Sequence, residues 1–326
     1  MSLGKVSRRA AIQGTALSLI SPPSIFSAAA QQATRVVYPF SAGGAGDGVG
    51  RIVADQIGAG MSVATVVENR TGAAGRMGTK SVSIAEPDGT TLLFVSSPAM
   101  SIYPHVYPKL EYDPIRDFAP ISLVATFDVA LAVWPGTNVK TIAELISWAK
   151  QNPEKANYGS PGAGGIGHFF AVMFALSVGV DFRHVSYRGA NSAVTDLVSG
   201  QIPIAVVTVG DVVELHRAGR VRVLAISGGE RTPLLPEVPT FKEAGVSAEG
   251  QGWYAVYAPA KTSVQLIDQI NKVIVSRLAI SEVRERLLKL NVVPKTSTPQ
   301  ELAEFQINDT NRWAPVVKAS GFTSQL

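Results

Sequence analysis

The sequence predicts an α/β fold in which mostly parallel sheets are flanked by helices, and three observations support that class. Strand-like and helix-like segments alternate along the chain, helix-start patterns recur between the strands, and glycine-rich turns lead from strand to helix. Each strand candidate is rich in β-branched or aromatic residues and ends near Gly, Pro or Asn. The strand candidates are residues 35–40, 64–68, 91–96, 129–134, 156–159, 182–187, 202–207, 222–226 and 253–258.

Helical spacing fills the intervals between these strands. Thr141 and Thr298 each stand three residues before a glutamate, which is the spacing of a capping box at a helix start. Residues 267–290 are predicted to form one long helix, with a candidate break near Ile280. One predicted helix face carries a clear apolar set, which is Val49, Ile52, Val53 and Ile57.

Length and composition limit the class of protein. A chain of 326 residues is long enough for about two domains, each with its own core. Hydrophobic residues make up 46% and charged residues 17%, which is typical of a compact globular protein. Residues 1–30 hold Lys5, Arg8 and Arg9 and no acid, so the remainder carries 26 basic against 25 acidic residues. That even balance leaves no basic stripe, and the sequence predicts no nucleic-acid partner.

Residues 1–30 have the layout of a secretory signal peptide. Residues 7–13 (SRRAAIQ) resemble a twin-arginine motif, residues 10–20 form a short, mostly apolar core, and residues 28–30 are three alanines that suit a signal peptidase. We therefore expect export to the periplasm, with a mature chain that begins near Gln31. The twin-arginine route and the general secretion route both stay open.

A first glycine loop, YPFSAGGAGDGVGR at residues 38–51, joins a predicted strand to a predicted helix. Glycines let backbone amides approach an anion, and a helix N-terminus adds positive potential. The loop holds no Lys or Arg before Arg51, so we expect an anion to be bound there by backbone amides. Asp47 is either an early-turn acid favoured by the helix dipole or a ligand contact.

A second glycine loop, NYGSPGAGGIGHFF at residues 157–170, also follows a strand and precedes an apolar helix. Gly162, Gly164 and Gly167 match G-x-G-x-x-G, so an NAD-linked oxidoreductase is an alternative function. Against it, the dinucleotide motif normally opens the first βαβ unit, whereas this one follows several predicted strands. Tight turns without a ligand are a further alternative. His168 either packs beneath the loop or faces a ligand.

Residue patterns for catalysis or metal binding are scarce. The histidines show no paired metal spacing, the chain has no cysteine, and no G-x-S-x-G nucleophile motif occurs. We therefore predict neither enzyme activity nor a metal or cofactor. The histidines are His105, His168, His184 and His216.

Seven segments, in this order and spacing, carry a resemblance to a known family. They are VYPFSAGGAGD, VVENRTGAAGRMG, PDGTTLLF, YDPIRDFAPISLVA, NYGSPGAGGIGH, HVSYRGANSAVTDLVSGQI and AGRVRVLAISGGERTPLLPEVPTFKEAG. Together they resemble the Bug family, the TctC-like extracytoplasmic solute receptors of tripartite tricarboxylate transporters. The resemblance runs from about Arg35 to the C-terminus and covers nearly the whole predicted mature chain.

The resemblance implies a two-lobed periplasmic binding protein of type II-like architecture. It places lobe 1 at residues 33–131 and 255–326 and lobe 2 at residues 132–254, with hinge strands near 129–134 and 253–258. The implied function is capture of a small carboxylate, either a di- or tricarboxylate, an amino acid or an aromatic acid. A monomeric receptor would deliver this solute to integral membrane permease subunits. A carboxylate sensor no longer coupled to transport is a further alternative.

The resemblance also implies the site, because family members hold a ligand carboxylate between the two glycine loops with backbone amides and ordered waters. The residues assigned in this way are Phe40, Ser41, Ala42, Gly43, Gly44, Asp47, Ser160, Gly162, Ala163, Gly164, His168, Asn191 and Asp196. Gly46 and Gly165 stand where the family usually has Ser or Thr, and Ser186 stands where it has Pro. Because two hydroxyls are lost, we expect more room or more water at the site.

Overall fold

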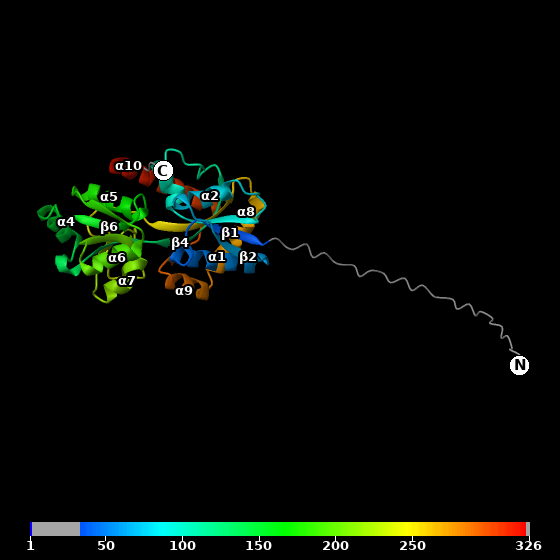
Figure 1. Ribbon diagram of the computed structural model, residues 1–326, viewed down its shortest axis with the longest axis horizontal. Helices are drawn as coiled ribbons and strands as arrows, with labels where there is room; N and C mark the ends of the chain where they lie inside the picture. The colour runs from blue at the N-terminus through cyan, green and yellow to red at the C-terminus, as the bar shows by residue number, and fades with distance from the viewer. Residues whose placement is uncertain (2–32, 324–326) are drawn as a thin grey trace. The chain divides into compact units, whose positions relative to one another are not determined.

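Two β-sheets with helices on their faces form the frame of the protein, whose computed structural model describes Met1 and residues 33–323 (Figure 1). The predicted signal peptide therefore lies outside the described residues, apart from Met1. The first sheet has the order β11-β4-β10-β3-β1-β2 and contains β1 (Thr34–Tyr38), β2 (Thr65–Asn69), β3 (Thr91–Ser96), β4 (Phe118–Phe127), β10 (Gly252–Pro259) and β11 (Val293–Pro294). The second has the order β7-β6-β8-β5-β9 and contains β5 (Val129–Val133), β6 (Asn157–Pro161), β7 (Arg183–Tyr187), β8 (Ile204–Thr208) and β9 (Arg222–Ile226).

The helices confirm the predicted α/β class, and most of them connect strands of one sheet. They are α1 (Ala45–Met61), α2 (Arg76–Ser83), α3 (Tyr103–Val106), α4 (Ile142–Gln151), α5 (Ile166–Val178), α6 (Ala190–Ser199), α7 (Val209–Arg217), α8 (Val264–Leu278), α9 (Ser281–Lys289) and α10 (Pro299–Ser320). The long helix expected at 267–290 is divided into α8 and α9 at the predicted break. Within residues 33–323, none of the helices combines the length and apolar character needed to cross a bilayer.

Both sheets are mixed, which corrects the expectation of mostly parallel strands. β1, β2 and β3 pair in parallel, as do β6, β7 and β8. In contrast, β10 is antiparallel to β3 and β4, and β5 is antiparallel to β8 and β9. The route of the chain explains this difference. The chain leaves the first sheet at the end of β4 and returns in β10, so β10 enters at the edge where β4 left and runs in the opposite direction.

β4 and the two-residue β11 are the strands that the sequence did not predict. β4 is buried along almost its whole length, so it lacks the alternation that marks a half-exposed strand. It also contains Pro120, which normally argues against an inner strand. The pairing with β10 shifts register between Val256 and Tyr257, and this irregularity accommodates Pro120 opposite Tyr257.

The chain passes between the two sheets twice. The first crossing is Asp128, between β4 and β5, and the second is the segment 227–251 between β9 and β10. Oδ1 of Asp128 accepts a hydrogen bond of 2.8 Å from Nε2 of Gln251, so the two crossings are linked. Burial raises the pKa of Asp128 to about 6. β5 and β10 cover most of the expected hinge strands; the hinge role and the lobe boundaries stay predictions.

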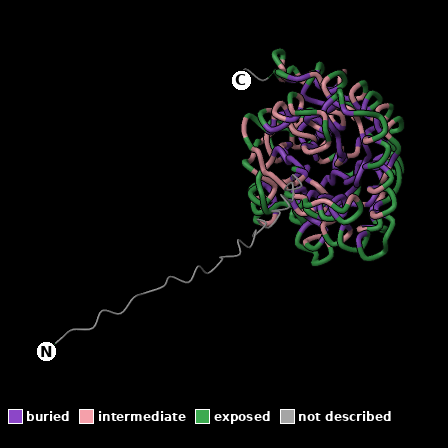
Figure 2. The backbone as a smooth tube through the Cα atoms, turned by 90° about the vertical axis from the view of Figure 1, so that its right-hand side faces the viewer, coloured by how far each residue is buried: buried purple, intermediate pink, exposed green. Residues whose placement is uncertain are grey.

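The C-terminal helix α10 packs against elements of both sheets. It contacts β4 and the turn η2 (Pro98–Ile102) beside the first sheet, and it contacts α5 beside the second. Buried segments run through the interior, and exposed segments lie on the outside (Figure 2). One apolar cluster contains buried residues of both sheets, so the two halves share part of their core.

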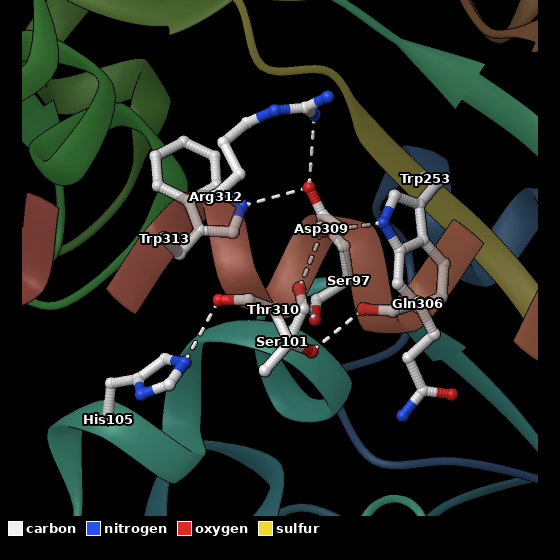
Figure 3. A network of polar contacts seen from close by, with 9 residues as sticks. All are labelled: Ser97, Ser101, His105, Trp253, Gln306, Asp309, Thr310, Arg312 and Trp313. Atoms are coloured by element: carbon white, nitrogen blue, oxygen red, sulfur yellow. Dashed lines mark hydrogen bonds and ion pairs between the residues drawn. The ribbon is translucent and has the colours of Figure 1, made fainter. Parts of the chain in front are cut away.

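A buried carboxylate anchors α10 to the first sheet (Figure 3). Asp309 is 1% exposed, and its Oδ2 accepts hydrogen bonds from the Ser101 hydroxyl at 2.7 Å and the Trp253 indole N–H at 2.9 Å. Trp313 and Arg312, both on α10, donate to Oδ1 at 3.1 and 3.3 Å. Burial raises the pKa of Asp309, and the donors act against it. Since Trp253 lies on β10, this network joins the returning strand to the last helix.

Replacing this carboxylate should destabilise the protein strongly. We expect Asp309→Ala to lower the free energy of unfolding by about 3 kcal/mol or more, because two indole N–H groups and a hydroxyl lose a buried acceptor. Urea denaturation measures the change. Asp268→Ala, at an exposed position on α8, is the control and should change stability by less than about 0.5 kcal/mol. A cost below about 1 kcal/mol for Asp309→Ala would contradict the anchoring role.

Candidate functional site

The two glycine loops are structural repeats of each other. Ala42-Gly43-Gly44-x-Gly46-Asp47 leads from β1 into α1, and the same pattern ending in His168 leads from β6 into α5. Each residue of the second pattern lies 121 positions after its counterpart, as Gly164 does after Gly43. Gly43 and Gly164 both adopt left-handed backbone angles, with φ of 88° and 81°. The next glycines, Gly44 and Gly165, have φ and ψ of −88° and 173°, and −87° and 173°.

Both loops lead into helices that no side chain caps. The N-cap residues of α1 and α5 are Gly44 and Gly165. In contrast, the hydroxyls of Thr141, Ser263 and Thr298 accept first-turn amides in α4, α8 and α10, and α7 begins with a capping box. Like α1 and α5, helices α2, α6 and α9 have no side-chain cap. The first amides of a helix have no intrahelical partner, and they carry the positive end of the helix dipole. The two glycine loops therefore present amides that an anion can bind.

Three of the amides assigned to the ligand are already engaged within the protein. The Gly43 amide donates to Oδ2 of Asp47 at 3.0 Å, and the Gly164 amide donates to Nδ1 of His168 at 3.1 Å. The Gly162 amide donates to the carbonyl of Tyr187 at 2.8 Å, which extends the parallel pairing of β6 and β7. An anion bound at these loops would therefore have to use the amides of the following residues, where the helices begin.

Both carboxylate oxygens of Asp47 accept hydrogen bonds from other groups of the protein. Its Oδ2 also accepts from Nε of Arg51 at 3.0 Å, and its Oδ1 accepts from Nδ2 of Asn69 at 2.9 Å. The same Asn69 amide donates to the carbonyl of Phe40 at 3.1 Å. Burial acts to raise the pKa of Asp47, but the Gly43 amide, Arg51 and Asn69 outweigh it and hold the pKa below its usual value. The carboxylate therefore braces the first loop.

His168 and Ser160 lie beneath the second loop. Ser160 is fully buried, and its hydroxyl is 2.8 Å from Nε2 of His184. The His168 ring stacks on the His184 ring with centroids 4.2 Å apart. Burial, and secondarily His184, lowers the pKa of His168 to about 4, so its ring is neutral at pH 7. Of the two positions that the sequence left open for His168, the structure shows the packed one.

The remaining assigned residues are placed as follows. Ser41, Ala42 and Ala163 are exposed in the loops, and Asn191 is exposed in the first turn of α6. Asp196, farther along α6, accepts a hydrogen bond of 2.8 Å from the Tyr187 hydroxyl. The carbonyl of Tyr187 also accepts a hydrogen bond from the Gly162 amide, so Asp196 is connected to the second loop through that tyrosine.

The space that Gly46 leaves is filled, which corrects the expectation of more room at that position. A Cβ on Gly46 would lie 2.1 Å from the Tyr38 hydroxyl and 3.0 Å from the Tyr254 hydroxyl. Two tyrosine hydroxyls thus converge under the start of α1. Tyr38 stands just before the loop in sequence, but Tyr254 comes from β10, and no sequence pattern connects it to the loop.

Open space lies in front of both loops. A Cβ on Gly43, Gly44 or Gly162 would meet no atom within 4 Å. Ile166, the first residue of α5, packs against the apolar cluster that β1, β3 and α1 form, so the start of α5 lies close to the first sheet. The start of α1 therefore borders open space, whereas at the start of α5 a Cβ on Gly164 or Gly165 would meet Phe322 at 3.0 Å or the Pro161 carbonyl at 3.1 Å.

Comparison with known proteins identifies the family. The sequence profile described as "Tripartite tricarboxylate transporter family receptor" (TctC) matches residues 49–322. The chain belongs to this family. It is 31% identical over 320 residues to a protein from the tcbD-tcbE intergenic region of a Pseudomonas strain, covering 97% of this chain and 95% of the relative. It is 29% identical to BugT of Bordetella pertussis, covering 88% and 89% of the two chains.

Solved structures of the same type match the fold. MatC from Rhodopseudomonas palustris with bound malate has a TM-score of 0.75 at 28% identity, over 87% of this chain and 98% of that one. An R. palustris protein solved with adipate has a TM-score of 0.79 at 28% identity, over 89% and 98%. The periplasmic binding protein BugD has a TM-score of 0.76 at 28% identity, over 90% and 98%. The resemblance to the Bug family is confirmed, and this TctC receptor is related to solute-binding proteins rather than to enzymes.

The tight contact at Gly46 gives a stability prediction. Gly46→Ala should cost about 1–3 kcal/mol, because the new methyl group overlaps the Tyr38 hydroxyl. In a Tyr38→Phe background the cost should fall, since that hydroxyl is gone. Gly44→Ala is the matched control, because its Cβ meets open space. Equal costs for Gly46→Ala and Gly44→Ala in chemical denaturation would refute the contact.

The neutral His168 ring should make the fold sensitive to acid. Its pKa is about 4 in the folded protein and about 6.5 in an unfolded chain. Its contribution to stability is therefore complete above pH 6.5 and is lost as the pH falls toward 4. Between pH 7 and pH 5, His168→Asn should lose on the order of 1–2 kcal/mol less stability than the wild type. Asp128 has a raised pKa, so its contribution has the opposite sign, but it is present in both proteins and cancels. Identical losses in urea denaturation would contradict a buried neutral ring.

Proposed function

We propose that this TctC receptor captures a small carboxylate between its two glycine loops and delivers it to the membrane permease of a tripartite transporter. The observation that carries the proposal is the pair of uncapped helix starts, α1 and α5, which have matching backbone angles, with open space at Gly43 and Gly44 in the first loop and at Gly162 in the second. Neutral amides converging from two helices suit a compact carboxylate, because they stabilise its charge without a buried arginine.

The relatives support this chemical class. MatC was solved with malate and another R. palustris member with adipate, and both are dicarboxylates. We extend only the class to this chain, together with export to the periplasm and cleavage near Gln31. N-terminal sequencing of exported material tests the cleavage, which an intact Met1 on periplasmic protein would refute.

The two alternatives have less support. In the dinucleotide motif of the second loop, the Gly162 and Gly164 amides already donate to Tyr187 and His168, so neither is available to a pyrophosphate in this conformation. No observation favours a sensor over a transport receptor. Titration with NADH separates the oxidoreductase from the receptor directly.

Binding should depend on open backbone at the start of α1. The probes are malate, adipate, citrate, glutamate and benzoate, first in a thermal-shift screen and then by calorimetry with the acids that bind. We expect Gly44→Val to weaken binding at least tenfold, because its side chain occupies space next to the helix-start amides, while Ser41→Ala costs only about 1 kcal/mol.

Two controls make the comparison decisive. Gly44→Val should still fold, with a loss of stability of about 1 kcal/mol from the less favourable N-cap residue, since its Cβ meets no protein atom. For each acid that binds, the derivative in which every carboxylate is converted to an amide should bind more weakly than the acid. Wild-type affinity in Gly44→Val, or equal affinity for acid and amide, would refute the amide site.

A further inference from the structure

Two equivalent residues brace the glycine loops, and they differ in chemistry. Asp47 and His168 occupy the same position of the repeated pattern, and each accepts the amide of the left-handed glycine four residues earlier. We propose that both are positioning residues, which fix the loop backbone and thereby free the helix-start amides for the solute, without touching the solute themselves. This inference rests on the proposed function and assigns a role to both residues that differs from ligand contact.

The helix starts elsewhere in the chain show what this arrangement changes. In the capping boxes of α7 and α10, the third helical residue accepts the N-cap amide, as Asp211 does from Thr208 at 3.0 Å and Glu301 from Thr298 at 2.8 Å. The N-cap side chain in turn accepts the amide of the third residue. A capping box therefore uses two of the amides that an anion would bind.

In the glycine loops, the third helical residue accepts a hydrogen bond from the amide one residue before the N-cap, and not from the N-cap amide, so the bond is displaced by one residue. Asp47 and His168 are also third helical residues, but they accept the amide before the N-cap and leave the amides of Gly44 and Gly165 free of them. A glycine N-cap has no side chain, so the amide of the third residue is not capped either. α4 shows the same displaced bond from Lys140 to Glu144, but there Thr141 caps the helix. The glycine loops combine the displaced bond with an uncapped start.

The hydrogen bond from the Gly164 amide to His168, which braces the second loop, depends on a neutral imidazole. Because Nδ1 of His168 accepts the Gly164 amide, its proton must be on Nε2, and a charged ring could not accept this bond. The groups around the ring are the His184 ring on β7, the Tyr158 hydroxyl on β6 at 3.4 Å from the His168 carbonyl, and Phe322 after α10. A cavity of about 480 Å³ lies beside the ring, and its lining includes His168, His184 and Asp181. The low pKa of His168 keeps this brace intact at neutral pH.

Two substitutions separate the acceptor from the ring. His168→Asn offers an amide oxygen near the place of Nδ1 and loses the stacked ring, whereas His168→Phe keeps a ring and loses the acceptor. We expect His168→Asn to bind the best acid of the five-probe panel within about threefold of wild type, and His168→Phe at least tenfold more weakly. Hydrogen exchange at the Gly164 amide should be faster in His168→Phe and protected in His168→Asn. Wild-type affinity in His168→Phe, or equal weakening in both variants, would overturn the proposal.

A wild-type measurement covers the case in which His168→Phe does not fold. In an NMR titration of the full chain without solute, the Gly164 amide resonance should follow the protonation of His168 as the pH falls toward 4, while the Gly43 resonance should not. A Gly164 amide resonance that does not change in this titration would refute the hydrogen bond from Gly164 to His168. If wild-type protein binds none of the five acids, the proposed function fails, but exchange and titration still decide the positioning role.

Discussion

A carboxylate that is bound without a buried cation needs backbone amides that no other group satisfies, and this requirement governs the structure around both loops. A helix start with glycine at the N-cap costs roughly a few tenths of a kcal/mol relative to one capped by Ser or Thr. The chain has that cost at α1 and α5, and α2, α6 and α9 also lack a side-chain cap, while α4, α7, α8 and α10 have a hydroxyl residue at the N-cap. A solute bound at α1 or α5 would restore that stability, which would link solute binding to the stability of the folded state.

The rest of the fold holds those two helix starts in place. β1 and β6 end at the loops, and the two sheets to which they belong are connected by two chain crossings, by α10 and by a shared apolar cluster. Asp128 and Gln251 join the two crossings by one hydrogen bond, and the Asp309 network ties α10 to the returning strand β10. Any rearrangement of one sheet relative to the other must therefore act on Asp128 and on the packing of α10. Both carboxylates are buried, and burial raises the pKa of each, so protonation is easier there than at the surface.

Sequence reasoning found the parts of the fold that have local signals. Nine strands, the start of α10 and the break between α8 and α9 follow from residue type and spacing, and both glycine loops were located for the same reason. β4 was missed because continuous burial and Pro120 remove the usual strand pattern. The use of the Gly43 and Gly164 amides could not be foreseen, because it depends on the direction of an N–H group in a left-handed turn. Tyr254 was missed because its contact with Gly46 joins distant parts of the chain.

The arrangement also separates the recognition of charge from the choice of solute. Backbone amides at a helix start bind any carboxylate of suitable size, since they read the anion and not the remainder of the molecule. Within one family, related receptors were solved with malate and with adipate, which differ in length and in a hydroxyl group. Selection among acids would then have to come from other groups that border the loops. In this chain the paired hydroxyls of Tyr38 and Tyr254 replace a side chain at Gly46. At this position two hydroxyls that come from the strands below take the place of a group on the helix itself.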